Sequence, residues 1–410
     1  MSENLFQELE TLSNVSVALE GSVTIPADAQ KILSIFLGNG SGVSNEADYD
    51  NGGHGTLSKL ASGALDILKK IIAWVKEKIE EFRLWFKEYR LAIEKTEELL
   101  DKTEEALRAT HSFNEGKIKL SPMVTGELAV EGVLDKTFPD KMVHLRDVLT
   151  SMFNIRKDLS ELTVQTLDAF KEASSSEDVL FMSTKGKDLM LQYSRVGQEI
   201  ARHLKTVDNG KSMFGERRFT QKELFHTSNV EKVSDLASLP LPGGYVFVSA
   251  YVKETERSFF GEDTSVADGF NVVASLIDNL SPNLVRAHSS GISFSGDSLD
   301  RNGCVKVIEE SRNIVSVIKS DKTVSNDENT LKDAVNYAND YMKGSSSVEY
   351  GRTLAKILKS SVQILETDRF KTYNYAMKVV RASLKYIQAS FDSTPVEEVS
   401  ENHRLPSPSV

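Results

Sequence analysis

The chain has 410 residues, with 49 lysines and arginines against 60 aspartates and glutamates, a formal net charge of −11. A chain this acidic is a poor general binder of phosphate backbones, because non-specific affinity for nucleic acid comes from cations that neutralise phosphates. The single cysteine, Cys304, excludes a disulfide framework and any metal site built from several cysteines. Nine prolines, 24 glycines and 27% charged residues favour a mainly helical protein.

The acidic charge is concentrated at the N-terminus. Residues 1–60 hold two basic and eight acidic residues, a net charge of −6 and more than half of the total. A short helix is predicted over 27–37, and the Gly-, Ser-, Asn- and Asp-rich segment 38–55 is a predicted flexible linker. We therefore interpret residues 1–56 as an acidic N-terminal segment with a linker.

Neither a secretory signal nor a membrane span is predicted. The first 21 residues lack a basic n-region and a continuous apolar core. The chain has no run of about 18 uninterrupted apolar residues, the length that a spanning helix needs. We therefore expect synthesis in a reducing cytoplasm and no membrane partner.

A long helix is predicted over 57–107, about 75 Å at a rise of about 1.5 Å per residue. Its apolar positions step alternately by three and four residues, which is the pattern of a heptad seam. The seam consists of Leu68, Ile72, Val75, Ile79, Phe82, Phe86, Tyr89, Ile93, Thr96, Leu100, Thr103 and Leu107. Trp74, Trp85, Ile67 and Leu84 lie off the seam and predict contacts with more than one neighbouring helix.

Two further helices complete a predicted bundle over 57–207. One begins near Met142, with Asp140 as a predicted N-cap, and ends at the serines 174–176. The other spans roughly 177–207. Helices of this length that follow one another form long antiparallel hairpins or bundles.

The middle of the chain, 208–325, is a predicted small α+β module. Strands are predicted over 245–252 and 291–296, and helices over 269–280 and 305–320. Residues 326–391 form a predicted C-terminal helical segment, and the polar, proline-containing residues 392–410 a disordered tail. The predicted fold class is therefore mainly α, with a long helical hairpin or bundle, a small α+β module and a C-terminal helical segment.

The sequence contains no pattern that points to catalysis. The seven histidines form no HExxH motif, and no two lie at metal-ligand spacing. Gly291, Ser293 and Ser295 resemble a nucleophile elbow but lack its second glycine. Cys304 has no histidine nearby in sequence, so a buried thiol is the simplest interpretation. We predict no enzyme activity, no metal and no cofactor.

The order of segments along the chain is informative. An acidic N-terminal segment is followed by a Gly/Asn linker and then by a helix rich in Lys, Trp and Phe over 64–89. This arrangement resembles the internal head proteins of giant tailed phages of the phiKZ type, mainly over residues 1–110. The resemblance implies a non-enzymatic virion structural protein of the capsid interior, made in the host cytoplasm and packaged with the genome. It also implies an N-terminal propeptide, removed by a prohead protease after a glutamate that has a small or apolar residue two positions earlier.

Three glutamates fit that rule: Glu20 before Gly21, Glu46 before Ala47, and Glu131 before Gly132. The implied partners are other virion or core proteins, the protease and the packaged DNA, although not by bulk charge. A homo-oligomer through the 57–107 helix is a further expectation. The alternatives that the sequence leaves open are a cytoplasmic coiled-coil adaptor or scaffold, a helical pore-forming toxin and an enzyme of unrecognised type.

Overall fold

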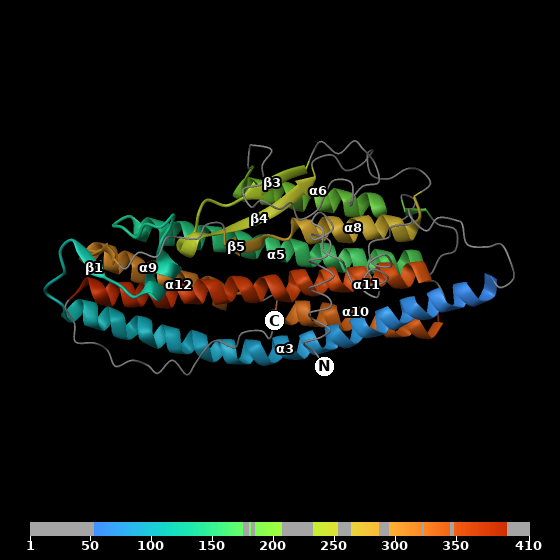
Figure 1. Ribbon diagram of the computed structural model, residues 1–410, viewed down its shortest axis with the longest axis horizontal. Helices are drawn as coiled ribbons and strands as arrows, with labels where there is room; N and C mark the ends of the chain where they lie inside the picture. The colour runs from blue at the N-terminus through green and yellow to red at the C-terminus, as the bar shows by residue number, and fades with distance from the viewer. Residues whose placement is uncertain are drawn as a thin grey trace, which may run out of the picture.

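The computed structural model describes residues 53–174, 180–181, 185–206, 233–252, 264–286, 295–321, 324–344 and 348–391. In these ranges the chain forms an elongated bundle of helices with a small antiparallel sheet along one side (Figure 1). The mainly α prediction is confirmed. The predicted helix over 27–37, the segment before residue 53 and the tail after residue 391 lie outside the described residues.

The longest element, α3 (Gly53–Ala109), begins slightly before the predicted start. From Leu68 onward every seam position is buried except Phe86, which is half-buried. Ile71 and Trp85 are buried as well and widen the apolar stripe, whereas Leu84 points away from the core and is 64% exposed. The wide stripe explains why α3 has several neighbours.

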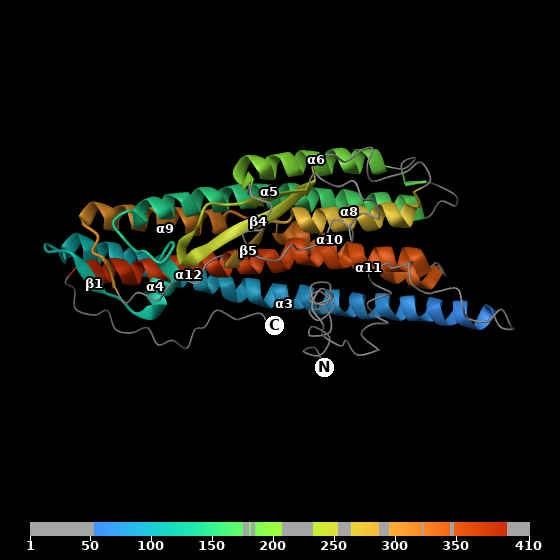
Figure 2. The ribbon, with the colours of Figure 1, turned by 45° about the horizontal axis from the view of Figure 1, so that its top comes forward.

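Those neighbours come from the C-terminal part of the chain. α3 packs against α9 (Arg301–Lys319), α10 (Val324–Gly344), α11 (Val348–Val362) and α12 (Asp368–Ser390). The second predicted rod, α5 (Phe138–Ser174), packs instead against α9, α8 and α6. Figure 2 shows α6 outside α5, with α3 on the opposite side of the bundle.

The boundaries of α5 and α6 correct two predictions. α5 ends at Ser174 as expected but begins at Phe138, so Asp140 lies in its first turn rather than at the N-cap. The carboxylate of Asp135 accepts a hydrogen bond from the backbone N–H of Thr137 at 2.8 Å, just before the helix. α6 (Gly186–His203) is shorter than the predicted 177–207.

The sheet has the order β2-β3-β4-β5, with every pair antiparallel. β4 (Tyr245–Val252) coincides with the strand that its aromatic and β-branched residues predicted. It pairs with β3 (Val233–Ala237) and β5 (Asn283–Arg286) and packs against α8 (Val266–Leu280) and α6. β2 (Lys205–Thr206) forms the opposite edge.

A second, two-stranded sheet pairs β1 (Lys117–Lys119) with β6 (Ser295–Asp297). β6 is the described end of the strand predicted over 291–296, whose first residues lie outside the described ranges. The short helices α4 (Pro122–Leu128) and η2 (Pro242–Gly244) close the same side of the bundle.

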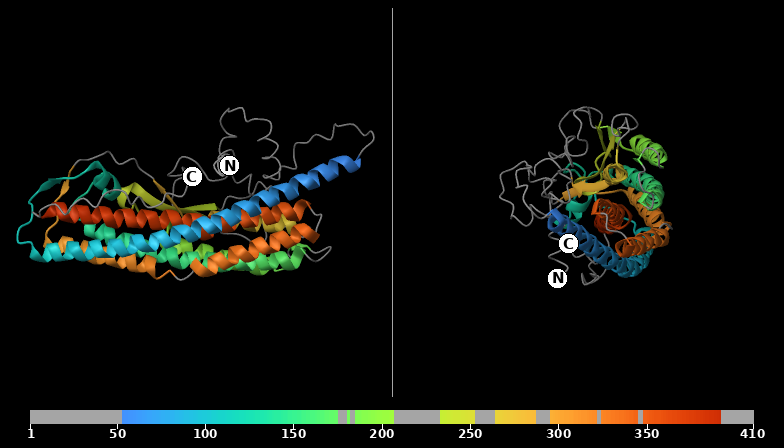
Figure 3. Two further views of the ribbon diagram at one scale, coloured as in Figure 1. Left: turned by 90° about the horizontal axis from the view of Figure 1, so that it is seen from below. Right: turned by 90° about the vertical axis from the view of Figure 1, so that its right-hand side faces the viewer.

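The C-terminal helices form the centre of the molecule. In the end-on view of Figure 3, α12 lies among the other helices. Within the predicted C-terminal helical segment 326–391, a π-helical turn, η3 (Gln363–Thr367), separates α11 from α12. One cluster of buried side chains runs from Leu68 in α3 to Phe391 beyond α12. The division into segments 57–207, 208–325 and 326–391 stays a prediction. No helix within the described residues has the length and apolarity of a membrane span.

Candidate functional site

The structure describes one of the three predicted processing sites, Glu131–Gly132, and places it at the tip of a tight turn. The backbone N–H of Val130 donates to the carbonyl of Val133 at 2.9 Å, and the reverse bond measures 3.0 Å. Glu131 has φ 52° and Gly132 has φ 81°. Two successive left-handed residues are the geometry of a two-residue hairpin turn, so this bond is exposed but not extended.

The residues just before this turn are fixed in the core. Leu128, Ala129 and Val130 are buried, and the carbonyl of Ala129 accepts a hydrogen bond from Gly243 at 3.0 Å. Beside the turn is a recess of about 280 Å³, lined by Val130, Glu131, Val133, Leu134, Asp135, Thr137, Phe138 and Lys141. A protease that binds an extended segment would have to pull these residues out of the core.

The other predicted sites, Glu20 with Gly21 and Glu46 with Ala47, lie outside the described residues. Both precede α3, whose helix begins at Gly53. A cut at either position therefore leaves the whole described body in one piece, whereas a cut after Glu131 separates α3 from the helices that it packs against.

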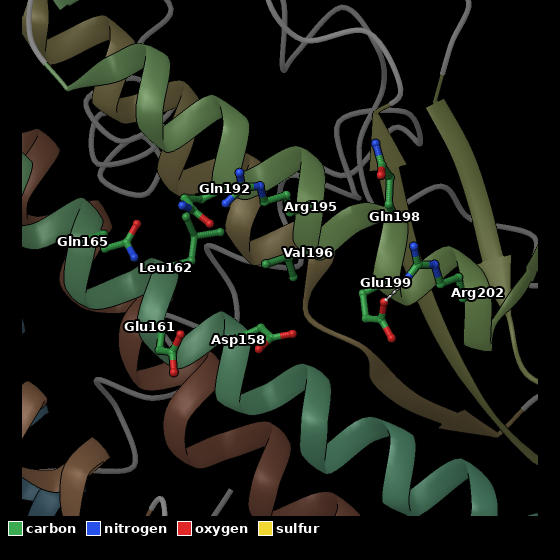
Figure 4. Close-up of a pocket in the computed structure, with 10 residues that line it drawn as sticks. All are labelled: Asp158, Glu161, Leu162, Gln165, Gln192, Arg195, Val196, Gln198, Glu199 and Arg202. Atoms are coloured by element: carbon green, nitrogen blue, oxygen red, sulfur yellow. Dashed lines mark hydrogen bonds and ion pairs between the residues drawn. The ribbon is translucent and has the colours of Figure 1, made fainter.

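A larger groove of about 370 Å³ lies between α5 and α6 (Figure 4). Its walls are mainly charged and amide side chains: Asp158, Glu161, Leu162 and Gln165 from α5, and Gln192, Arg195, Val196, Gln198, Glu199 and Arg202 from α6. Arg202 forms an ion pair with Glu199 at 2.6 Å. No aromatic side chain lines the groove, unlike the mostly apolar wall of a typical small-molecule site.

The environment moves the pKa values of two carboxyl groups in this groove in opposite directions. Burial, followed by the charges of Glu161 and Glu199, raises the pKa of Asp158. The hydrogen bond with His203, followed by the charge of Arg202, lowers the pKa of Glu199. The ionisable lining residues of the groove are carboxylates and arginines, without a serine, cysteine or histidine among them, and we assign no reaction to it.

A network of largely buried polar groups surrounds Arg369 in α12, which is itself fully buried. Its guanidinium forms ion pairs with Asp321, at 3.4 Å, and with Asp327. Ser160 of α5 donates to Asp327 at 2.5 Å, and the Tyr373 hydroxyl donates to Asp321. This cluster joins α5, the connection between α9 and α10, the first turn of α10, and α12.

Two neighbouring groups extend the cluster. The carboxylate of Asp368 accepts hydrogen bonds from Ser281 at 2.5 Å and from Gln363 of η3 at 2.7 Å. Arg156 of α5 is buried nearby, and its pKa is lowered by burial and then by the charge of Arg369. Because the carboxylates face protein donors and are closed to solvent, we interpret the cluster as a device that fixes how these helices pack. The cluster was not predicted, because Arg369 lies in the polar stretch 366–369 (ETDR), which does not indicate burial.

The other side chains of the described residues that could carry chemistry, among them Cys304 and His203, do not come together in one site. Cys304 is buried in α9, as predicted, and burial raises the pKa of its thiol to about 12. Within the described ranges, no group of three or more His, Cys, Asp or Glu side chains is placed to hold a metal ion. His203 lies at the end of α6, hydrogen-bonded to Glu199 at 3.1 Å.

Comparison with known proteins identifies the family. The model of the phiKZ-like phage internal head proteins matches residues 2–389, which extends the resemblance from the first 110 residues to nearly the whole chain. No curated protein and no solved structure matches. The match includes the N-terminal segment, the helical bundle and the sheet alike. The chain therefore belongs to the family of phiKZ-like phage internal head proteins.

Proposed function

We propose that the chain is a non-enzymatic structural protein of the phage head interior, packaged with the genome and processed at its N-terminus by a prohead protease. The observation that carries this proposal is the family match over residues 2–389. It supports a virion component made in the host cytoplasm, with other core proteins and the protease as partners.

The packing of the described residues supports a structural role. One core extends along the bundle, the buried carboxylates near Arg369 are engaged by protein donors, and the thiol of Cys304 is protonated at neutral pH. These features favour a protein that acts through its shape and surface.

The packing of α3 favours processing before the bundle, at Glu20 or Glu46. Trp85 of α3 lies 4.0 Å from the ring of Phe370 in α12, and Tyr89 stacks on Tyr373 at 5.3 Å, measured between ring centroids. After a cut at Glu131, these non-covalent contacts alone would hold α3 in the bundle. Removal of residues 1–46 would delete six acidic residues and one lysine, which changes the net charge from −11 to −6.

The packing of α3 also bears on the alternative of a coiled-coil adaptor. The seam residues of α3 are buried within their own chain, against α9 to α12. A homo-oligomer through the 57–107 helix stays a prediction, and it would have to use the outer face of α3, where Leu84 and Leu91 are exposed. The seam itself therefore favours an internal bundle over an adaptor.

Packaging can be tested with purified phage particles. We expect the chain to resist an external protease in intact particles and to be digested after the capsids are opened, as followed by mass spectrometry. A major capsid protein and a tail protein serve as internal controls for protected and accessible proteins. Absence of the chain from particles, or its digestion in intact ones, would exclude the proposal.

Processing can be tested by co-expression of the chain with the prohead protease. We expect Glu20→Gln or Glu46→Gln to abolish the corresponding cut, because the protease recognises the glutamate before the scissile bond. Glu131→Gln is the matched control and should leave the products unchanged. Loss of cleavage in the Glu131→Gln variant alone would place the site in the turn and contradict the assignment.

A further inference from the structure

The central helix α12 presents a row of cations to solvent. Most of its side chains are buried, and its exposed residues are Lys371, Lys378 and Lys385. Asn374 and Arg381, both half-buried, lie between them. The seven-residue spacing places the three lysines on one face of the helix, over about 21 Å at a rise of about 1.5 Å per residue. Seen from below in Figure 3, α12 is visible beside α3 over much of its length.

The row has no exposed acidic residue beside it on its own helix and forms no ion pair within the described residues. Residues 370–391 contain no aspartate or glutamate, in a chain that is acidic overall. Within the described part of the chain, Lys371, Lys378 and Lys385 have no ion-pair partner. Many other lysines of the bundle do pair with a carboxylate, namely Lys69, Lys78, Lys171, Lys185, Lys306, Lys319, Lys332 and Lys343.

The row is also held rigidly by its neighbours. Arg381 donates to the hydroxyl of Thr96 and to the carbonyl of Ala92 in α3, each at 3.2 Å. The hydroxyl of Tyr89 donates to the carbonyl of Tyr373 at 3.1 Å. These bonds fix α12 beside α3, so the helix backbone that carries the three lysines is already ordered before a ligand binds.

We propose that Lys371, Lys378 and Lys385 contact the phosphate backbone of double-stranded nucleic acid. Ammonium groups are point charges on flexible stems, so they tolerate the mismatch between a helix repeat and the phosphate repeat. A duplex presents one negative charge per about 1.7 Å of its axis, so a straight row of about 21 Å meets several phosphates. The contact is independent of base sequence. The identity of the duplex as packaged DNA rests on the proposed function.

An acidic protein is the competing occupant, and the side chains around the row disfavour it. Protein interfaces are anchored by aromatic and large apolar side chains at their centre. Large exposed apolar residues occur elsewhere in the described ranges, such as Leu84, Met123 and Val133, but α12 contributes none of them. Charged and amide groups alone suit a hydrated backbone of phosphates.

The test compares a triple variant of the row with a matched control. The row variant is Lys371→Gln, Lys378→Gln and Lys385→Gln. The control is Lys87→Gln, Lys157→Gln and Lys187→Gln, three exposed lysines on α3, α5 and α6. Both variants remove the same charge and retain good helix formers, so circular dichroism and the melting temperature should match the unchanged chain. Binding to a mixed-sequence duplex is measured between about 50 and about 200 mM salt.

We expect the slope of log K against log salt to become shallower by about 2.7 in the row variant and to stay unchanged in the control. Between about 50 and about 200 mM salt, the fold-loss of affinity should then be about forty times larger for the unchanged chain than for the row variant. Equal slopes in the two variants, or no binding by the unchanged chain, would overturn the proposal. Binding of polyglutamate as tightly as DNA would also overturn it and assign the row to an acidic protein. None of these results depends on whether the chain is found in particles, which tests the proposed function separately.

Discussion

At the scale of single residues, Phe181 shows how closely the bundle is fitted. Its side chain is buried between the first turns of α6 and α8, where Gly186 and Gly269 leave room for the ring. A Cβ atom at Gly269 would lie 2.1 Å from Cγ of Phe181, and one at Gly186 would lie 2.6 Å from Cε1. The ring also meets Phe270 edge-on, with centroids 5.2 Å apart.

We predict that Gly269→Ala lowers the free energy of unfolding by about 2 kcal/mol, because the methyl group would overlap the ring of Phe181. Gly126→Ala in α4 is the control, since a Cβ there meets nothing within 4 Å. It should stabilise the chain by up to about 1 kcal/mol through helix propensity. Urea denaturation measures both, and equal effects of the two substitutions would contradict the packing around Phe181.

Lys356 in α11 provides a second prediction at this scale. Burial lowers the pKa of its ammonium from 10.5 to about 8, although the nearby charge of Asp278 acts in the opposite direction. Between about pH 8 and pH 10.5 the unfolded chain therefore binds more protons at this site than the folded chain, so stability rises with pH across that window. Lys356→Met should remove this rise and stabilise the protein at pH 7 by roughly 2 kcal/mol. Urea denaturation at several pH values checks it, and the same pH dependence in the variant would refute it.

At the scale of elements, α9 is the bridge between the two long rods. Toward α3, Arg312 contacts Asp101 and Glu104 at 2.7 Å each, and Lys319 contacts Glu97 at 2.8 Å. Toward α5, both oxygens of Glu310 accept hydrogen bonds from Arg146, at 2.9 and 2.8 Å. α9 therefore forms ion pairs with α3 on one side and with α5 on the other.

Burial decides which of these pairs affects stability. Glu310 is only 7% exposed, so Arg146→Ala leaves a buried carboxylate unpaired and should cost about 2 kcal/mol. Lys319→Ala breaks an exposed pair and should cost no more than about 0.5 kcal/mol. Denaturant midpoints at low and high salt compare them. If Lys319→Ala cost more stability than Arg146→Ala, the exposed pair with α3 would be the more important one, which would contradict this prediction.

The elements themselves could be largely predicted from sequence, because they follow local periodicity. The three-four spacing in α3 and the aromatic and β-branched run of β4 are strong local signals, and both elements were found where expected. The π-helical turn at Gln363–Thr367 could not be predicted, because the same apolar pattern continues through it. The start of α5 was misjudged, because Asp140 resembles an N-cap but lies inside the helix and pairs with Lys306 at 2.6 Å.

Which helices pack against one another was harder to predict from the sequence than where the helices lie. A long hairpin or bundle was predicted, but the packing of α3 against helices more than 190 residues later in the chain was not. That choice depends on long-range contacts such as the bonds from Arg301 to the carbonyls at the end of α3. Glu131 could be identified from the sequence as a candidate processing site, but the burial of the residues before it could not be predicted.

At the scale of the whole molecule, the core requires α3, and this leads to a truncation experiment. Residues 47–410 should keep the circular dichroism and melting temperature of the full chain, because the described body stays complete. Residues 132–410 should lose fixed tertiary packing, since Phe82, Trp85 and Tyr89 no longer cover Phe370 and Tyr373. Near-ultraviolet circular dichroism and binding of a hydrophobic dye distinguish the two. A cooperative unfolding transition in 132–410 would show that α3 is dispensable.

We propose that this member of the family is a structural protein of the head interior, and that N-terminal processing leaves its body, from α3 to α12, intact. The most direct measurement is the first residue of the chain recovered from purified particles, determined by mass spectrometry of its N-terminal peptide. We predict a chain that begins at Gly21 or Ala47 and still contains residues 53–391. A chain that begins at Met1 or at Gly132, or that is missing from the particles, would contradict the account.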